Sequence, residues 1–110
     1  MSTTPTRIPY ALASHPMVQK EIHDLGCVVP FGIKVEGEFR PLHDVRVVGS
    51  NATYRSTPYQ IQRYSLSKEI KHVTGLQTVR WLNHLYFKDG FGRIVLLKNF
   101  VAEKHGLRFT

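Results

Sequence analysis

Cationic and aromatic side chains, the two kinds that bind phosphates and nucleobases, gather in the second part of this 110-residue chain. Residues 51–110 carry ten basic side chains and three acidic ones, whereas residues 1–50 carry five of each, so the formal charge of +7 belongs entirely to the second part. Nine of the twelve aromatic residues are also there, and several, such as Trp81 beside Arg80, adjoin a cation. A polyanion with flat bases would engage both kinds of side chain. A solvated basic surface around an ordinary aromatic core has the same composition, so composition does not separate the two.

The six histidines and the single cysteine do not form a pattern typical of catalysis or metal binding. The nearest pairs are His15 with His23, eight residues apart, and His72 with His84, twelve apart, and neither His-x-x-x-His nor Cys-x-x-Cys occurs. The basic part has no paired carboxylates and no glycine-rich phosphate loop. We therefore expect no catalytic residues, no metal site and no cofactor, and a protein that is not an enzyme. Cys27, which precedes two valines, is expected to pack as a small hydrophobic side chain.

Length and hydropathy indicate one folded domain. The chain is too short for a tandem array, and with 42% hydrophobic residues it can bury a real core. No apolar run of about 18 residues exists, and residues 1–20 lack the features of a secretory signal. We expect no membrane segment and a location in the cytosol or a nucleoid or nucleoprotein compartment, without secretion. Pro5 and Pro9 oppose a helix, which predicts an extended N-terminal arm at 1–13 before a single α+β domain at 14–110.

Periodicity predicts the elements of the first half. A proline in the first turn and a short apolar face that ends at Gly26 indicate a helix. The following alternation indicates a β-hairpin that turns at Glu36-Gly37, and Pro30 and Pro41 within it indicate an edge or a bulge. In chain order, the predicted elements are a helix at Pro16–Leu25, a hairpin over 28–48, a loop at 49–57 and a short strand at 59–64.

The segment Leu66–Leu97 has apolar residues at steps of three. Each such step lags one helical turn by about 60°, so one continuous helix would spread these side chains around its whole circumference. A break at Thr74-Gly75 restores one apolar side to each half, because glycine accepts the left-handed conformation that ends helices. Two helices are therefore predicted, at Leu66–Val73 and at Gln77–Tyr86.

Two further elements follow the second helix. Asp89-Gly90 supplies the positive φ angles of a tight turn, which predicts a hairpin whose second strand is Ile94–Leu97. A last helix is expected from Asn99 to His105, ended by Gly106.

The second helix of the pair carries hydrogen-bond donors, a cation and flat rings opposite its apolar side. These types read base edges and phosphates in a major groove. Helix, turn, helix and hairpin in this order resemble the winged helix-turn-helix family of DNA-binding domains, over residues 59–97 only. The resemblance implies that Gln77–Tyr86 is the recognition helix and that the hairpin is a wing beside the phosphate backbone. The candidate nucleic-acid-binding residues are Gln77, Arg80, Trp81, His84, Lys88 and Arg93, with Lys68 and Lys71 on the preceding helix.

Two functions from different classes stay open on the sequence. The first is a non-enzymatic nucleic-acid-binding protein, a DNA-binding regulator, with DNA favoured over RNA as the partner. The second is a protein-interaction subunit or small inhibitor in a viral or ribonucleoprotein assembly, or a homodimer, for which the N-terminal arm and the edge of the 28–48 hairpin offer pairing surfaces. A plain α+β domain whose basic helix is only solvated is the alternative to the winged architecture.

Overall fold

In the part of the chain that the structure describes, three helices accompany a six-stranded antiparallel sheet and one pair of parallel strands. The computed structural model describes the backbone of residues 6–8, 16–48 and 51–109, and the side chains of residues 16–48 and 51–106. The helices are α1 (Pro16–Gly26), α2 (Leu66–Thr74) and α3 (Leu97–His105). The sheet strands, in spatial order, are β5 (Tyr64–Ser65), β4 (Asn51–Arg55), β3 (Glu38–Val48), β2 (Phe31–Val35), β6 (Tyr86–Lys88) and β7 (Ile94–Leu96). The parallel pair is β1 (Thr6–Ile8) and β8 (Leu107–Phe109).

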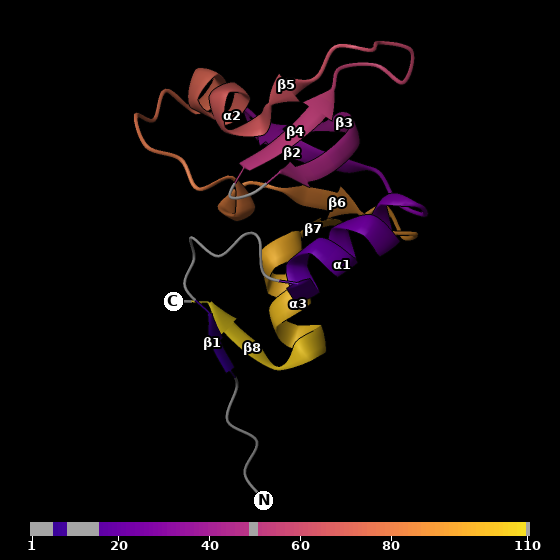
Figure 1. The fold of residues 1–110 in the computed structure, drawn as a ribbon, viewed down its shortest axis with the longest axis vertical. Coiled ribbons are helices and arrows are strands. Elements are labelled where there is room, and N and C mark those ends of the chain that lie inside the picture. Colours follow the sequence, from indigo (N-terminus) through magenta and orange to yellow (C-terminus); the bar gives the residue numbers. More distant parts are fainter. Residues whose placement is uncertain (1–5, 9–15, 49–50, 110) are drawn as a thin grey trace, which may run out of the picture.

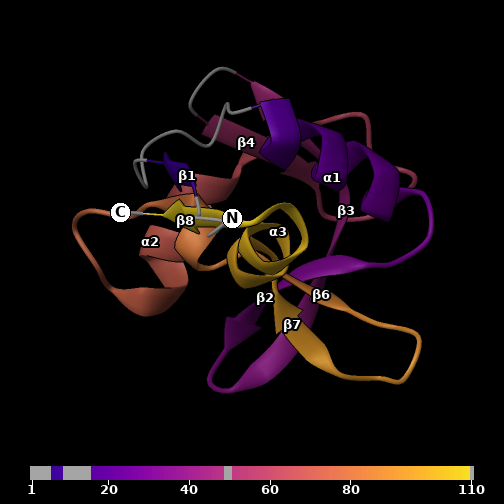
Figure 2. The ribbon, with the colours of Figure 1, turned by 90° about the horizontal axis from the view of Figure 1, so that it is seen from below.

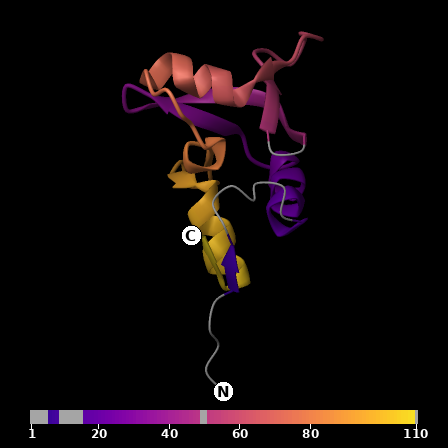
Figure 3. The same ribbon diagram turned by 60° about the vertical axis from the view of Figure 1, so that its left-hand side comes forward.

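Strands β2, β3 and β4 lie between α2 and the other two helices. In Figure 1, α2 lies above these strands, whereas α1 and α3 lie below them, and Figure 3 shows the same order after a turn of the molecule. Figure 2 shows the β2–β3 and β6–β7 hairpins diverging, because β2 and β6 pair only at Phe31 with Phe87 and at Gly32 with Tyr86. The loop between β4 and β5 projects from the edge of the molecule (Figures 1 and 3).

The β2–β3 hairpin forms as predicted. Glu36 and Gly37 both have positive φ, at 53° and 83°, as a tight two-residue turn requires. Pro41 of β3 lies opposite Gly32 of β2. On the other side of β3, β4 pairs only from His43 onward, so that edge of the strand is open at Pro41. The proline therefore marks a stretch with one open edge, where its missing N–H costs no ladder bond.

Two predictions between residues 49 and 65 are wrong. Residues 51–55 were expected in a loop and form β4, because Ala52 and Tyr54 point into the core and β3 offers a pairing edge. Residues 49 and 50 lie outside the described ranges. The strand predicted over 59–64 is reduced to β5, because Tyr59 and Ile61 alternate in sequence but are exposed, and none of the described elements covers them.

Helix α2 begins where predicted and ends one residue later. The backbone N–H of Lys68 donates to Oγ of Ser65, which caps the first turn. Gly75, with φ of 73°, adopts the left-handed conformation, and its N–H donates to the carbonyl of Lys71. Thr74 therefore ends the helix, one residue beyond the predicted limit.

The other two helices also match their predictions closely. Helix α1 covers the expected Pro16–Leu25 and one further residue. Helix α3 starts at Leu97 instead of Asn99, and Gly106, with φ of 62°, ends it.

The second predicted helix, Gln77–Tyr86, does not form. The segment contains one 3-10 turn, η1 (Trp81–Asn83), and from residue 86 onward it belongs to β6. Pairing of β6 with β2 places the end of the segment in the sheet, and such tertiary contacts routinely override a helical periodicity. Tertiary packing therefore outweighs the local periodicity. Three buried side chains anchor the segment: Trp81, Leu82 and Leu85.

One hydrophobic core joins the elements into a single α+β domain. A buried carboxylate also connects two of the helices. Glu21 of α1 is 1% exposed, and its Oε1 lies 2.9 Å from Nζ of Lys104 and 2.8 Å from Nε2 of His105, both on α3. The core consists of Val18, Ile22, Phe31, Ile33, Leu42, Ala52, Tyr54, Leu66, Ile70, Trp81, Leu82, Leu85, Phe87, Leu97 and Val101.

Two further expectations concern the periphery. Of the predicted arm at 1–13, only Thr6–Ile8 is described, and it forms β1 beside β8. Residues 1–5 and 9–13 lie outside the described ranges. Cys27 was expected to be buried, and this is wrong: it is exposed just after α1, and its Sγ donates to the carbonyl of His23 at 3.4 Å. The valine that follows is also exposed, so apolar neighbours in sequence did not indicate burial here.

Candidate nucleic-acid interface

The eight residues predicted to bind nucleic acid do not lie on one surface. Lys68 and Lys71 are exposed on α2, three residues apart and hence on neighbouring positions of one side. Lys88 and Arg93 are exposed on the β6–β7 hairpin. Figure 1 shows α2 above strands β2–β4 and the hairpin below them, so these two pairs cannot contact one short stretch of a ligand together.

The expected base-reading stripe is absent. Trp81 is only 3% exposed, so its ring is not available to stack on a base. His84 is half-buried, and burial lowers the pKa of its ring, which favours the neutral form. Gln77 and Arg80 are exposed, but they lie in the irregular segment between α2 and η1. The prediction of a recognition helix with an outward Trp81 is therefore wrong, because the core takes up the tryptophan.

The β6–β7 hairpin forms, but the predicted tight turn at Asp89-Gly90 is wrong, because neither residue has a positive φ and the left-handed residue is Gly92, with φ of 81°. Asp89 organises this longer turn, in which its N–H donates to the carbonyl of Arg93. Its carboxylate accepts the backbone N–H groups of Phe91 and Arg93, each at 2.9 Å, and the Nε of Arg93 at 2.8 Å. These bonds, led by the backbone N–H of Arg93, hold the pKa of Asp89 below its usual range. The charge of Arg93 is thus matched by one carboxylate, which leaves Lys88 as the surplus cation of the hairpin.

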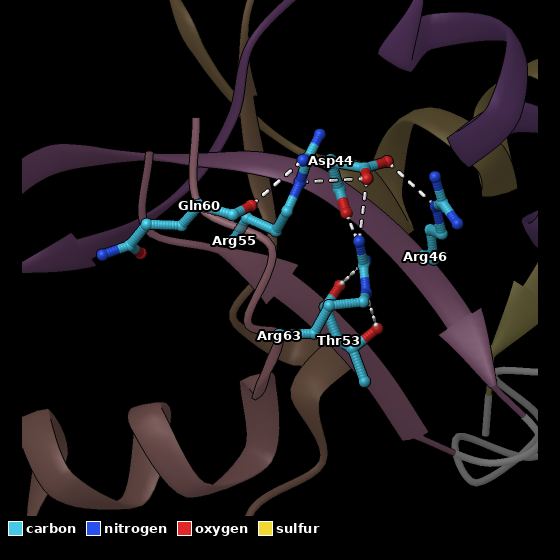
Figure 4. A network of polar contacts seen from close by, with 6 residues as sticks. All are labelled: Asp44, Arg46, Thr53, Arg55, Gln60 and Arg63. Atoms are coloured by element: carbon cyan, nitrogen blue, oxygen red, sulfur yellow. Dashed lines mark hydrogen bonds and ion pairs between the residues drawn. The ribbon is translucent and has the colours of Figure 1, made fainter. Parts of the chain in front are cut away.

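Three arginines converge on one carboxylate at a bend of β3, and we call Asp44, Arg46, Arg55 and Arg63 the arginine cluster (Figure 4). The Oδ1 of Asp44 accepts from Nε of Arg46 at 3.0 Å, and its Oδ2 accepts from Nη1 of Arg63 at 2.8 Å. The Nε of Arg55 lies 3.2 Å from the same Oδ2. This buried N–H is not aligned for a hydrogen bond and has no other acceptor in the described residues.

The backbone of β3 creates this convergence. Asp44 has φ of 50°, a conformation that aspartate tolerates better than most residues, and the register with β4 shifts between His43 and Arg46. The bulge turns the carboxylate toward Arg55 of β4 and toward Arg63, which precedes β5. Partial burial raises the pKa of Asp44, but the hydrogen bonds from Arg46 and Arg63 outweigh this and hold it below its usual range.

The cluster carries more positive charge than its carboxylate needs. Three guanidinium groups surround one carboxylate, which leaves a surplus of two positive charges. Like charges held around one carboxylate repel each other, and solvent screening weakens this repulsion without removing it. A bound anion would relieve this repulsion, and phosphate oxygens match the donor geometry of arginine.

Two of the arginines also fix the loop between β4 and β5, residues 56–63. Arg55 donates from Nη1 to the carbonyl of Gln60 at 3.1 Å. Arg63 donates from Nε to Oγ1 of Thr53 at 2.9 Å and from Nη2 to the backbone carbonyls of Thr53 and Asp44. The loop is therefore held at its middle and at its end, although residues 56–62 are all exposed.

The tip of this loop is apolar and fully accessible. Tyr59 is 92% exposed and Ile61 is 93% exposed, and residues 56–62 contain no charged side chain. Neither side chain is buried in the protein's own core, so both are available to a partner.

The arginine cluster was missed by the sequence analysis. Asp44 and Arg46 belong to the electrically neutral first part, whereas Arg55 and Arg63 belong to the basic second part. Only the pairing of β3 with β4 and the bulge at Asp44 bring the four together, and neither the register nor a positive φ at an aspartate is visible in one sequence. The spacing of Arg46, Arg55 and Arg63, nine and eight residues apart, was the available signal, and it is weak.

Comparison with known proteins adds no family to this geometry. No protein-family model, curated protein or solved structure matches the chain. Among the residues described, no three histidine, cysteine, aspartate or glutamate side chains are placed to hold a metal ion. Within the same ranges, no helix combines the length and the apolar character needed to traverse a bilayer.

Proposed function

We propose that this protein is a non-enzymatic nucleic-acid-binding protein whose main phosphate contacts come from the arginine cluster. The observation that carries the proposal is the surplus of two positive charges held around Asp44 on a partly exposed surface. Neutralising such fixed charges with phosphates releases counterions from the nucleic acid, which supplies affinity without base contacts.

Arg46 is the member of the cluster best suited to meet a ligand. Its side chain is 66% exposed, against 29% for Arg55 and 26% for Arg63. Within the described ranges its one hydrogen bond is to Asp44, which Arg63 already pairs, so the fold gains little from it. An exposed ion pair of this kind contributes at most about 1 kcal/mol to stability. A phosphate can therefore take over Arg46 at small cost to the fold.

The loop at 56–63 supplies the second kind of contact. Arg55 of the cluster holds this loop at Gln60, the residue next to the exposed ring of Tyr59. A base that follows a phosphate bound at the cluster would stack on this ring, and base stacking on aromatic side chains tolerates any sequence. We expect binding with modest sequence preference.

The finer hypothesis of a winged DNA-binding regulator stays a prediction. Helix α2 and the β6–β7 hairpin correspond to its first helix and its wing, but no second helix is present at Gln77–Tyr86 to enter a groove. We therefore assign the leading contacts to the cluster, and Lys88 and Lys71 to weaker contacts with other parts of a long polymer.

Fluorescence anisotropy with labelled single-stranded DNA, duplex DNA and RNA at several salt concentrations tests the proposal. Arg46→Ala is compared with Arg93→Ala, a matched control of the same residue type, similar exposure and a single aspartate partner. We expect Arg46→Ala to weaken binding several-fold and to reduce the salt slope by about 0.7 on single strands. Arg93→Ala is expected to have a smaller effect on both quantities.

Two outcomes would contradict the proposal. Absence of binding to all three polymers at low salt would remove the function. A larger loss for Arg93→Ala than for Arg46→Ala would move the interface to the β6–β7 hairpin and would favour the winged arrangement.

A protein-interaction function is the second candidate, and the apolar loop tip favours it. An isoleucine at 93% exposure on an anchored, uncharged loop is suited to a pocket on a protein and gives little to a polyanion. Affinity capture from nuclease-treated extract, with wild type and with Ile61→Ser, tests this candidate. Partners that survive nuclease and are lost in the variant support it. Partners that vanish on nuclease treatment support nucleic-acid binding instead.

A further inference from the structure

A cavity of about 540 Å³ lies directly beside the arginine cluster. Its walls come from the end of α1, from the segment that leads into β2, and from β3 on both sides of the bulge. This volume falls within the range of about 300 to 1,000 Å³ that is typical of small-molecule sites.

The cavity and the cluster share two residues. Asp44 and Arg46 line the cavity and also belong to the cluster. His43, another lining residue, pairs across the strands with Arg55 of the cluster. A ligand whose negative group meets Arg46 can therefore extend into the cavity without a gap.

The walls suit a flat ring with polar edges. Ile22, Val29 and Leu42 provide apolar surface, on which the face of a heterocycle can pack. The rings of His23 and His43 add surfaces for stacking and nitrogen atoms that donate or accept hydrogen bonds. Such a mixture of apolar walls and a few polar groups is the usual lining of a ligand site.

We propose that this cavity takes one unstacked nucleobase of a single-stranded nucleic acid whose neighbouring phosphate lies against Arg46. The inference rests on the proposed function and adds a preference for single strands. A base inside a duplex reaches a cavity only after it leaves its pair and its stack, which costs free energy. A single strand does not bear this cost, so it binds more tightly than a duplex of the same sequence.

Cys27 makes the cavity directly observable. It is the only cysteine of the chain, it is exposed, and it lines this cavity. A base in the cavity shields its thiol, so bound single-stranded DNA is expected to slow alkylation by N-ethylmaleimide, followed by intact-mass measurement, by about fivefold or more. An abasic oligonucleotide has the same sugar and phosphate groups without bases, so at equal saturation it is expected to leave the alkylation rate unchanged.

A pair of variants tests the same point through affinity. Cys27→Trp adds a large ring to the lining of the cavity at an exposed position, and Cys27→Ser is its matched control. The tryptophan variant is expected to lose about tenfold in affinity for single-stranded DNA, the scale of one lost stacking contact. Its affinity for the abasic oligonucleotide is expected to stay the same, and the serine variant is expected to behave as wild type.

The outcomes separate the inference from the proposed function. Single-stranded DNA that binds at the cluster but leaves Cys27 as reactive as before overturns the inference and keeps the function. Equal protection by abasic and normal oligonucleotides overturns it as well, because the polymer then only covers the surface. No binding by any oligonucleotide overturns both.

Discussion

Arg63 and Asp44, nineteen residues apart in sequence, form a hydrogen-bonded ion pair of 2.8 Å between Nη1 and Oδ2. The same guanidinium donates to Oγ1 of Thr53 and to two backbone carbonyls, so one side chain ties the bulge of β3 to β4 and to the end of the 56–63 loop. The loop and the arginine cluster are therefore one structural unit, within which Arg63 holds the fold and Arg46 faces solvent.

This division of roles predicts different costs for two arginine substitutions. Arg63→Ala removes the hydrogen bonds that the guanidinium donates and leaves the backbone carbonyl of Thr53 in β4 without this donor. We therefore expect the free energy of unfolding to fall by about 2–3 kcal/mol. Arg46→Ala is expected to cost less than about 1 kcal/mol. Urea denaturation measures both. Hydrogen exchange in residues 56–63 should rise in Arg63→Ala alone, and equal losses of stability would contradict the assignment.

Asp44→Asn is expected to separate stability from binding. The change removes the carboxylate that three guanidinium groups share, so we expect the free energy of unfolding to fall by about 1–3 kcal/mol. It also raises the surplus charge by one, so affinity for nucleic acid should be kept or increased and its salt slope should steepen. Urea denaturation measures the free energy of unfolding, and fluorescence anisotropy measures the affinity and its salt slope.

The matched control for this change is Asp89→Asn. It alters the net charge equally but acts at the β6–β7 turn, beside Arg93. A gain in affinity that is the same in both variants would mean that only total charge matters, and the arginine cluster would lose its special role.

Glu21 is expected to make stability depend on acid pH. Burial raises the pKa of this carboxyl, but the hydrogen bonds from Lys104 and His105 outweigh burial and hold it below its usual range. The folded protein thus binds the proton less tightly than the unfolded chain, so this stabilisation is present at neutral pH and is lost as pH falls below about 4. Glu21→Gln should lower stability by about 2 kcal/mol at pH 7, and this difference should shrink in acid.

Denaturation curves between pH 7 and pH 2 measure this dependence. Glu103→Gln, an exposed change on α3, is the control. A difference between Glu21→Gln and wild type that stays constant with pH would show that the carboxylate charge does not matter.

Trp81 is the only tryptophan, which makes its burial testable in solution. At 3% exposure, its fluorescence is expected to resist quenching by iodide in the folded protein and to become sensitive on unfolding. Trp81→Ala should cost about 3–5 kcal/mol through the cavity that it leaves. Strong quenching of the fluorescence of the native protein would show instead that the Trp81 ring faces solvent, as a recognition helix requires.

Much of the fold could be predicted because its signals are local. Gly75 and Gly106 end helices in the left-handed conformation that glycine accepts without strain, and Glu36-Gly37 forms the expected hairpin turn. The hairpin over 28–48 followed from alternation and turn residues, whereas the hairpin after residue 86 was predicted with the wrong turn, since the positive φ lies at Gly92. Each of these features depends on a few neighbouring residues, which is why one sequence suffices.

The errors share one cause, which is competition for the core. Residues 51–55 become a strand because β3 offers an edge, and Tyr59 and Ile61 fail to become one because no described element packs over them. The periodicity at 77–86 was real, yet burial of Trp81 and the pairing of β6 with β2 outweighed it. Local propensity is worth tenths of a kcal/mol per residue, whereas burial of a large side chain is worth about 1.5–3 kcal/mol.

By itself, the sequence determined the composition of the chain, its excess of cations and rings, and the ends of its helices, since these depend on residue types and near neighbours. The tertiary structure alone decided which cations meet. Arg55 and Arg63 reach Asp44 through a strand register and a bulge that connect residues 11 and 19 positions apart, and a surplus of charge becomes a site only when such contacts hold it in one place.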